Sequence, residues 1–304
     1  MNKKDKKKRS FLKKNSNKIK RKIKRSIQKS KKIKRSIQKS IQKSKKIKRK
    51  IKRSLKKTFQ KIKSKILIND RLRKKYGILD VPLDNETNKG TIASSNFVDY
   101  NYQHLNNIIT FIHSEMKHRE DIYYFKQLED SFIEIDIVTK KIEPNYISLE
   151  EYKGNIEKSL NKRYVPITVN IKLPTHSHAN IILIDNELKN IEYFEPHGYK
   201  KEESTLENIP YAYYSKLKII KSFFLKILPG YNFINASDYF KKQGFQMKHD
   251  ARHGYCVTWS LLYLHYRLLN PYISIDILIK YLYYNITLNK LLRYARYIEI
   301  KLKF

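Results

Sequence analysis

The stretch His178–Gly198 reads HANIILIDNELKNIEYFEPHG and has the pattern of a β-hairpin. Its first arm, Ala179–Ile184, is a short apolar run rich in β-branched residues, and its second, Asn190–Phe194, alternates apolar and polar side chains. The acidic and amide residues at 185–187 are types common in turns. The stretch therefore predicts two antiparallel strands, around which the rest of the domain is arranged.

The open end of this hairpin carries polar side chains that suit catalysis. Antiparallel partners have a constant sum of residue numbers, so a turn centred between Asn186 and Glu187 sets His178 opposite Glu195. In that register we expect a hydrogen bond between the imidazole and the carboxylate. A slip by one residue would place the two side chains on opposite faces. His178 is thus a candidate base and Glu195 the acid that orients it.

The one cysteine of the chain, Cys256, precedes an apolar segment, Val257–Leu269, that predicts a buried helix ending before Pro271. A helix N-terminus and a neighbouring imidazolium both lower the pKa of a thiol. Cys256 is therefore a candidate nucleophile. A single cysteine also excludes a disulfide within the chain and favours a reducing, intracellular compartment.

Further periodic segments surround the hairpin and the cysteine helix. Arg163–Leu173 alternates and predicts a half-buried strand, so three successive strands form a small central antiparallel sheet. Residues 120–160 are mixed and receive no assignment. The expected fold class is α+β, with helices flanking the sheet. These helices are expected at Phe97–Lys117, after a cap at Ser95, at Tyr211–Ile227, and from Ser274 and from Thr287.

The order of these residues resembles a known protease family. A His at a strand start, an acid at the next strand's end, a Gln-containing loop and Gly-Tyr-Cys resemble the adenovirus protease and the SUMO-deconjugating cysteine proteases. The nearest words are YFEPHG, residues 193–198, and His178, which precedes Glu195 by the family interval. The resemblance covers about residues 163–270 and implies a papain-like, adenain-like cysteine protease fold.

The resemblance also implies a role for each residue. His178 is the general base, Glu195 fixes its tautomer, and Cys256 attacks a carbonyl to form a thioester. A glutamine side chain and the Cys256 backbone N–H hold the oxyanion. The family glutamine lies six or seven residues before the cysteine, where this chain has Asp250 and His249.

Two departures from the family pattern concern this site. An ionised carboxylate at position 250 would repel an oxyanion, so we assign the donor role to Gln246, ten residues before Cys256, and a loop-structuring role to Asp250. The aromatic residue that follows the family histidine is replaced by Ala179.

Other assignments remain open at this stage. His176 faces the same side of its strand as His178 and is an alternative base, while Asp185 and Glu192 are alternative orienters. Trp259 is expected in the core. We expect no metal and no cofactor, because the histidines give a weak metal signal. These histidines are His176, His178, His197, His249 and His253.

The N-terminal region has a different composition. Residues 1–65 hold 33 of the 66 Lys and Arg residues but one of the 28 acids, which leaves 33 against 27 for the remainder. KIKR recurs at Lys18, Lys32 and Lys46, a spacing of 14, and isoleucines recur with it on one helical face. We expect this tail to be disordered when free and to bind nucleic acid. An anionic membrane surface and a partner protein are the competing ligands.

These features predict three regions: a basic tail at 1–65, a linker at 66–94 and a protease-like domain at 95–304. The expected function is a virus-encoded thiol protease that cleaves peptide or isopeptide bonds in protein substrates and is tethered to nucleic acid. Its alternatives are an acyltransferase on the same fold and a non-catalytic nucleic-acid-binding core protein. No secretory signal or membrane span is expected, so localisation is host cytoplasm, nucleus or viral factory, and packaging into the virion is compatible.

Overall fold

The computed structural model describes the chain in segments. These are residues 43–44, 46–48, 50–54, 57–58, 70–85, 102–116, 120–123, 125, 132–136, 138–144, 147–172, 177–198, 211–240, 243–249 and 255–302. The chain divides into two compact units, Met1–Ile66 and Leu67–Phe304. Residues 1–42, Ser95, His176, Asp250 and His253 lie outside the described residues.

The second unit is built on one mixed sheet with strand order β2-β1-β3-β4-β5-β6. The centre, β3-β4-β5, is antiparallel as expected, whereas β1 runs parallel to β3 and β6 runs parallel to β5. The α+β class is confirmed, and the sheet is larger than the sequence pattern indicated. The strands are β1 Ile133–Asp136, β2 Lys141–Pro144, β3 Tyr164–Lys172, β4 Ser177–Asp185, β5 Asn190–Phe194 and β6 Asn232–Asn235.

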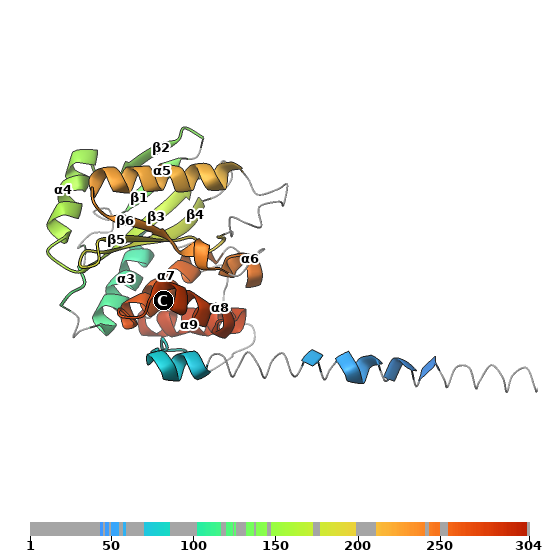
Figure 1. Cartoon of the computed structure of the whole chain (residues 1–304). Helices are drawn as coiled ribbons and strands as arrows, with labels where there is room; N and C mark the ends of the chain where they lie inside the picture. Colours follow the sequence, from blue (N-terminus) through green and yellow to red (C-terminus); the bar gives the residue numbers. More distant parts are fainter. Residues whose placement is uncertain are drawn as a thin grey trace, which may run out of the picture. The chain divides into compact units, whose positions relative to one another are not determined.

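Helices cover both faces of this sheet (Figure 1). One face packs against α4 and α5, and the other packs against α3, α7, α8 and α9. Successive residues of β4 point to opposite faces of the sheet. Ile182 packs in the core on the side of α4 and α5, and Ile181 packs in the core on the side of α7. The helices are α3 Tyr102–Glu115, α4 Leu149–Ser159, α5 Tyr211–Ile227, η3 Ala236–Tyr239, α6 Phe245–His249, α7 Cys256–Leu269, α8 Ile275–Asn285 and α9 Leu288–Leu302.

Helix α7 is the central helix of its layer. Its residues are apolar on most faces and most are buried, which is the pattern of a helix enclosed by a core. Its one buried guanidinium, that of Arg267, donates to both carboxylate oxygens of Glu192 on β5, at 2.7 and 2.8 Å. This ion pair joins the C-terminal part of α7 to the sheet.

The hairpin register differs from the prediction by two residues. Ile181 lies opposite Phe194 and Asp185 opposite Asn190, so continuing the register sets His178 beside His197 and not beside Glu195. The turn is centred one residue later than expected, and within it the Asp185 carboxylate accepts the N–H groups of residues 187 and 188, each at 3.1 Å. Lys189 then adopts a left-handed conformation at φ 52° and returns the chain. A shift of two keeps every side chain on its expected face.

Residues 70–85, which lie within the stretch predicted as a linker, belong to the second unit and contribute to its core. Ile78 and Val81 are buried in the core with α7, α8 and α9. The Asn270 side chain bonds the Leu79 backbone in both directions, at 2.7 and 2.9 Å, and the Asp80 carboxylate accepts the Tyr281 hydroxyl at 2.6 Å. The compact domain therefore begins earlier than residue 95.

The described part of the first unit is helical. Ile47 and Ile51, one turn apart, are 58% and 55% exposed. Among the described residues, no helix has both the length and the apolar content that a bilayer crossing requires.

Candidate active site

Cys256 is the first residue of α7, and its side chain lies close to His178 at the start of β4. Burial raises the pKa of the Cys256 thiol, but the hydrogen bond and charge of His178 outweigh that effect. The backbone N–H groups of Ala179 and Val257 act in the same direction, so the thiol pKa is lowered overall. The Val257 N–H belongs to the first turn of α7, so the helix N-terminus contributes to lowering the thiol pKa.

His178 lies between Cys256 and Glu195. Its Nε2 atom is hydrogen-bonded to Oε1 of Glu195, which leaves Nδ1 as the ring nitrogen available to the thiol. Burial lowers the pKa of His178, yet the Glu195 carboxylate and the Cys256 side chain oppose it and raise the pKa to about 9. A raised imidazole pKa and a lowered thiol pKa together favour an imidazolium beside a thiolate near neutral pH.

The hairpin forms this bond along a diagonal and not across a directly opposed pair. Glu195 lies two residues from the position that the register sets opposite His178. Diagonal neighbours on one face remain within reach of long side chains. His197, three residues after the end of β5, stacks its ring on that of His178 at 4.1 Å between centroids and 12° between planes. The expected contact therefore exists in spite of the wrong register.

Glu195 is fully buried and has polar partners on both carboxylate oxygens. Oε1 accepts from His178 and from the His197 backbone N–H at 3.2 Å, and Oε2 accepts from Nζ of Lys216 at 2.5 Å. Burial raises the pKa of this carboxyl, but the charges of His178 and Lys216 lower it by more. Glu195 is thus held ionised inside the protein.

Lys216 of α5 is the residue at this site that sequence reasoning missed. The sequence does carry a signal, because the spacing of four places Lys216 on the same helix face as Ile220 and Phe224. In the structure all three side chains are buried. A lysine on the apolar face of a helix needs an acidic partner. The pattern alone does not say which acid that is.

Gln246 lies on α6, directly beside the segment that follows Glu195. Its backbone N–H donates to Pro196 O at 3.0 Å, and the Gly244 N–H donates to Gly198 O at 2.5 Å. Helix α6 also packs on Trp259 in the first turn of α7, where the Phe245 and His249 rings stack at 5.5 and 5.8 Å. The loop that carries the predicted oxyanion donor is therefore attached both to the Glu195 segment and to the cysteine helix.

The Gln246 side chain is 2% exposed. Its Oε1 atom has no hydrogen-bond partner among the residues that the structure describes. Buried polar atoms are normally paired, so the unpaired amide oxygen beside these segments is unusual. Trp259, by contrast, is a core residue, as expected.

The alternative orienters have other partners. Asp185 closes the hairpin turn and accepts two hydrogen bonds from Arg163, each at 3.3 Å. Glu192 pairs with Arg267 on the α7 side of the sheet, whereas Glu195 pairs with Lys216 on the α5 side. Neither alternative acid is positioned to orient His178.

His178, Glu195 and His197 have donor atoms within 4.8 Å of one another, which invites comparison with a metal site. The lone pair of a ring nitrogen lies in the ring plane, and the two rings are nearly parallel. Their lone pairs therefore do not converge on one ion. Both oxygens of the carboxylate are also engaged. The cluster is better described as a network of hydrogen bonds and charges.

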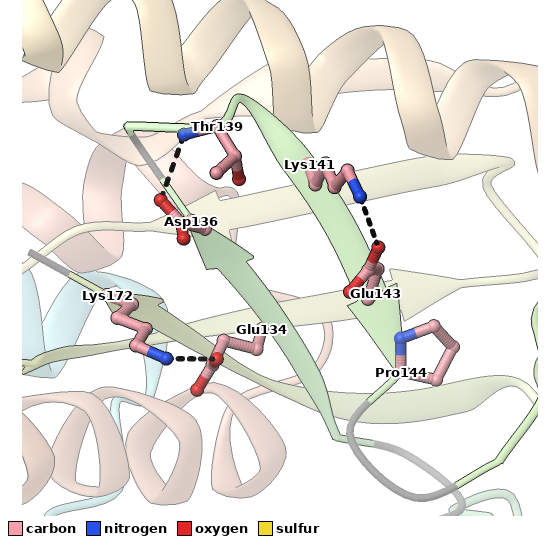
Figure 2. A pocket seen from close by; sticks show the side chains of 7 residues that line it. All are labelled: Glu134, Asp136, Thr139, Lys141, Glu143, Pro144 and Lys172. Carbon is pink, nitrogen blue, oxygen red and sulfur yellow. Dashed lines mark hydrogen bonds and ion pairs between the residues drawn. The ribbon is translucent and has the colours of Figure 1, made fainter.

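A pocket at the β1–β2 edge of the sheet contains charged side chains (Figure 2). Lys172 pairs with Glu134 and Lys141 pairs with Glu143, each at 3.7 Å, and Asp136 accepts from a backbone N–H of its own turn. The charges of this pocket largely compensate one another. None of the predicted catalytic residues lines it.

Comparisons with known proteins place this geometry in context. No family model matches the chain. A protein of Acanthamoeba polyphaga mimivirus, an ankyrin repeat protein by name, is 28% identical over 138 residues; the match covers 40% of this chain and 18% of that relative.

The structure is also similar to solved structures. The Chlamydia trachomatis effector ChlaDUB1 has a TM-score of 0.38 at 13% identity, over 73% of this chain and 96% of that one. The Chlamydia effector Cdu1 bound to ubiquitin has a TM-score of 0.38 at 12% identity, covering 67% and 93%. The SUMO protease Ulp1 has a TM-score of 0.33 at 12% identity, covering 77% and 94%.

Proposed function

We propose that this chain is a cysteine peptidase that cleaves peptide or isopeptide bonds with Cys256 as its nucleophile. The observation that carries the proposal is the connected series Cys256–His178–Glu195 at the N-terminus of a buried helix. A thiol with a lowered pKa, an imidazole and a buried orienting carboxylate are what nucleophilic acyl transfer requires.

The reaction proceeds in two stages. The Cys256 thiolate adds to the substrate carbonyl, and the resulting oxyanion is held by the Cys256 backbone N–H and the Gln246 side chain. His178 gives its proton to the leaving amine as the C–N bond breaks, which leaves a thioester. His178 then takes a proton from water, whose oxygen displaces the thiolate and yields the carboxylic acid.

Gln246 suits the role of oxyanion donor because its side chain is buried and its backbone N–H bonds Pro196 O, next to Glu195. The amide Nε2 group would donate to the oxyanion, since the Oε1 atom, unpaired among the described residues, can only accept. Removing one oxyanion donor ordinarily lowers the rate by about 10²–10³.

Cleavage assays with Cys256→Ala test the peptidase proposal. The substrates are aminomethylcoumarin amides of a peptide, of ubiquitin and of SUMO, because solved structures similar to this chain include a protein bound to ubiquitin and a SUMO protease. We expect fluorophore release by the native chain and a rate at least about 10³-fold lower in the variant. Lys218→Gln, an exposed change on α5, is the control. Undiminished cleavage by Cys256→Ala refutes the proposal, and acetyl-CoA consumption without cleavage indicates an acyltransferase.

We also propose that the basic tail binds nucleic acid and so holds the peptidase near its substrates. The support is its excess of Lys and Arg and the exposed apolar residues Ile47 and Ile51 on one side of a helix. Phosphate neutralisation would remove the like-charge repulsion that opposes this helix. The mimivirus relative is consistent with a viral setting.

Deleting residues 1–65 tests the tether. We expect most nucleic-acid affinity to disappear, together with the steep dependence of affinity on salt. Binding to neutral and anionic vesicles, measured in parallel, separates nucleic acid from a membrane surface. Unchanged nucleic-acid affinity after the deletion contradicts the proposal.

A further inference from the structure

Lys216 is a buried cation behind the Cys256–His178–Glu195 series. Its residue is 8% exposed, and its Nζ atom lies 2.5 Å from Oε2 of Glu195, the oxygen that does not bond His178. It comes from α5, in the helical layer on the opposite side of the sheet from α7 (Figure 1). Burying an ammonium group is unfavourable unless it is paired, so this arrangement calls for a reason.

The proposed reaction gives a reason for burying Lys216 beside Glu195. His178 must alternate between an imidazolium, which protonates the leaving amine, and a neutral imidazole, which accepts a proton from water. Glu195 is fully buried. If His178 were its only countercharge, each loss of the imidazolium proton would leave an unpaired carboxylate in the protein interior. That state is strongly disfavoured, so the proton would be difficult to release.

We propose that Lys216 is a positioning residue that keeps Glu195 ionised and oriented while His178 passes its proton to the leaving group. This inference rests on the proposed peptidase function. Lys216 Nζ donates to the oxygen of Glu195 that His178 does not use, so Glu195 keeps a partner in both protonation states of His178. Lys216 therefore acts through Glu195 and makes no contact with the substrate.

The groups that surround the pair determine the direction of the effect. His178 faces Glu195, Cys256 and the stacked ring of His197, and Glu195 faces His178, His197 and Lys216. The residue paired with His178 on β3 is the apolar Ile171. On the opposite face of the sheet, Glu192 and Arg267 neutralise each other. Removing the Lys216 charge thus removes a positive charge close to His178, and the imidazolium becomes harder to deprotonate.

Lys216→Gln tests the charge while preserving a donor to Glu195, and Lys216→Arg preserves the charge. The control is Lys218→Gln on an exposed position of the same helix. The His178 midpoint is followed by NMR titration of the histidine ring protons, with assignment by His178→Gln. We expect an upward shift of about one to two pH units in Lys216→Gln. Lys216→Arg and the control should remain near the native midpoint.

A leaving-group comparison distinguishes proton delivery from general structural damage. An amide needs its leaving nitrogen protonated, whereas a thioester does not. Lys216→Gln should therefore lower kcat for an amide substrate at least about tenfold more than for the matching thioester. Equal losses for both substrates, or an unshifted His178 midpoint in a folded variant, overturn the inference.

Two further comparisons keep the test decisive. If Lys216→Gln does not fold, the His178 midpoint is compared between Glu195→Gln and the double variant Glu195→Gln/Lys216→Gln, which buries no unpaired charge. A midpoint higher by about one unit in the double variant is expected, and equal midpoints refute the inference. The titration requires no turnover, so an inactive native chain refutes the peptidase proposal separately.

Discussion

Gly244→Ala should damage both stability and activity, because Gly244 lies directly against the segment that follows Glu195. A Cβ atom at this position would lie 2.2 Å from Pro196 O, 2.6 Å from His197 C and 2.7 Å from Gly198 N. Non-bonded carbon contacts are ordinarily about 3.5 Å. The neighbours are backbone atoms that cannot rotate away, so α6 would have to retreat by about 1 Å.

That displacement acts on two hydrogen bonds. Gly244 N–H donates to Gly198 O at 2.5 Å, and Gln246 N–H donates to Pro196 O at 3.0 Å. Each bond contributes about 1 kcal/mol net, and the overpacking itself costs about 1–3 kcal/mol. We expect a loss of about 3–5 kcal/mol in unfolding free energy if both bonds break. A misplacement of about 1 Å at Gln246 should lower kcat by about 10²-fold.

Urea unfolding and amide cleavage provide the measurements, and Gly154→Ala is the matched control. Gly154 lies within α4, and a Cβ there meets no atom within 4 Å. Alanine in a helix interior is favoured over glycine by about 0.5–1 kcal/mol, so the control should be slightly stabilised. If Gly244→Ala is as stable and active as the native chain, the close approach between α6 and the 196–198 segment is not real.

Two further predictions concern buried groups outside the site. Arg267→Met leaves Glu192 buried without its cation and should cost about 3–5 kcal/mol in urea unfolding, while Glu192→Leu added to it should recover part of the loss. Burial lowers the pKa of His265 to about 3, so the unfolded chain takes up a proton that the folded chain excludes. Stability should therefore fall as pH drops below about 6.5, by about 1.4 kcal/mol per unit. His265→Phe should lose that slope, and an equal slope in both proteins would contradict the assignment.

The sequence was informative wherever a segment follows one strong period. Tyr211–Ile227 and the helix opened by Cys256 have the predicted bounds or lie within one residue of them. The hairpin arms were also found, because burial on both faces of the central strand gives a continuous apolar run.

The register of the hairpin could not be predicted from those arms. It depends on the turn, where Asp185 accepts two backbone N–H groups and Lys189 adopts positive φ, and a lysine gives no signal for that conformation. The predicted pair His178 and Glu195 remained on one face only because the error was an even number of residues.

Residues 120–160 were not assigned because their structure depends on distant partners. The strands β1 and β2 have four residues each, and β1 pairs with β3, about thirty residues later in the chain. The start of α4 carries a local signal that the prediction did not use. Ser148 caps it by accepting from Glu151 N–H at 3.1 Å, and this Ser-x-x-Glu spacing is a readable capping signal.

Of the site residues, those with a local signature were found and Lys216 was not. Cys256, His178 and Glu195 lie at the ends of recognisable elements, whereas the pairing of Lys216 with Glu195 joins α5 to the end of β5 across separate segments. Such contacts depend on how helices are laid on the sheet, and helical periodicity fixes only the face on which a residue lies.

The most direct test of an activated Cys256 is the pH dependence of its alkylation by iodoacetamide. Cys256 is the one cysteine of the chain, so total alkylation reports on this thiol. We expect the rate in the native chain to fall only at a lower pH than for an ordinary thiol, because His178 lowers the thiol pKa. His178→Gln should move the midpoint towards the ordinary thiol value of about 8.5 and slow alkylation at pH 6.5 at least about tenfold. A native midpoint near the ordinary value, unchanged by His178→Gln, would contradict the proposed catalytic pair.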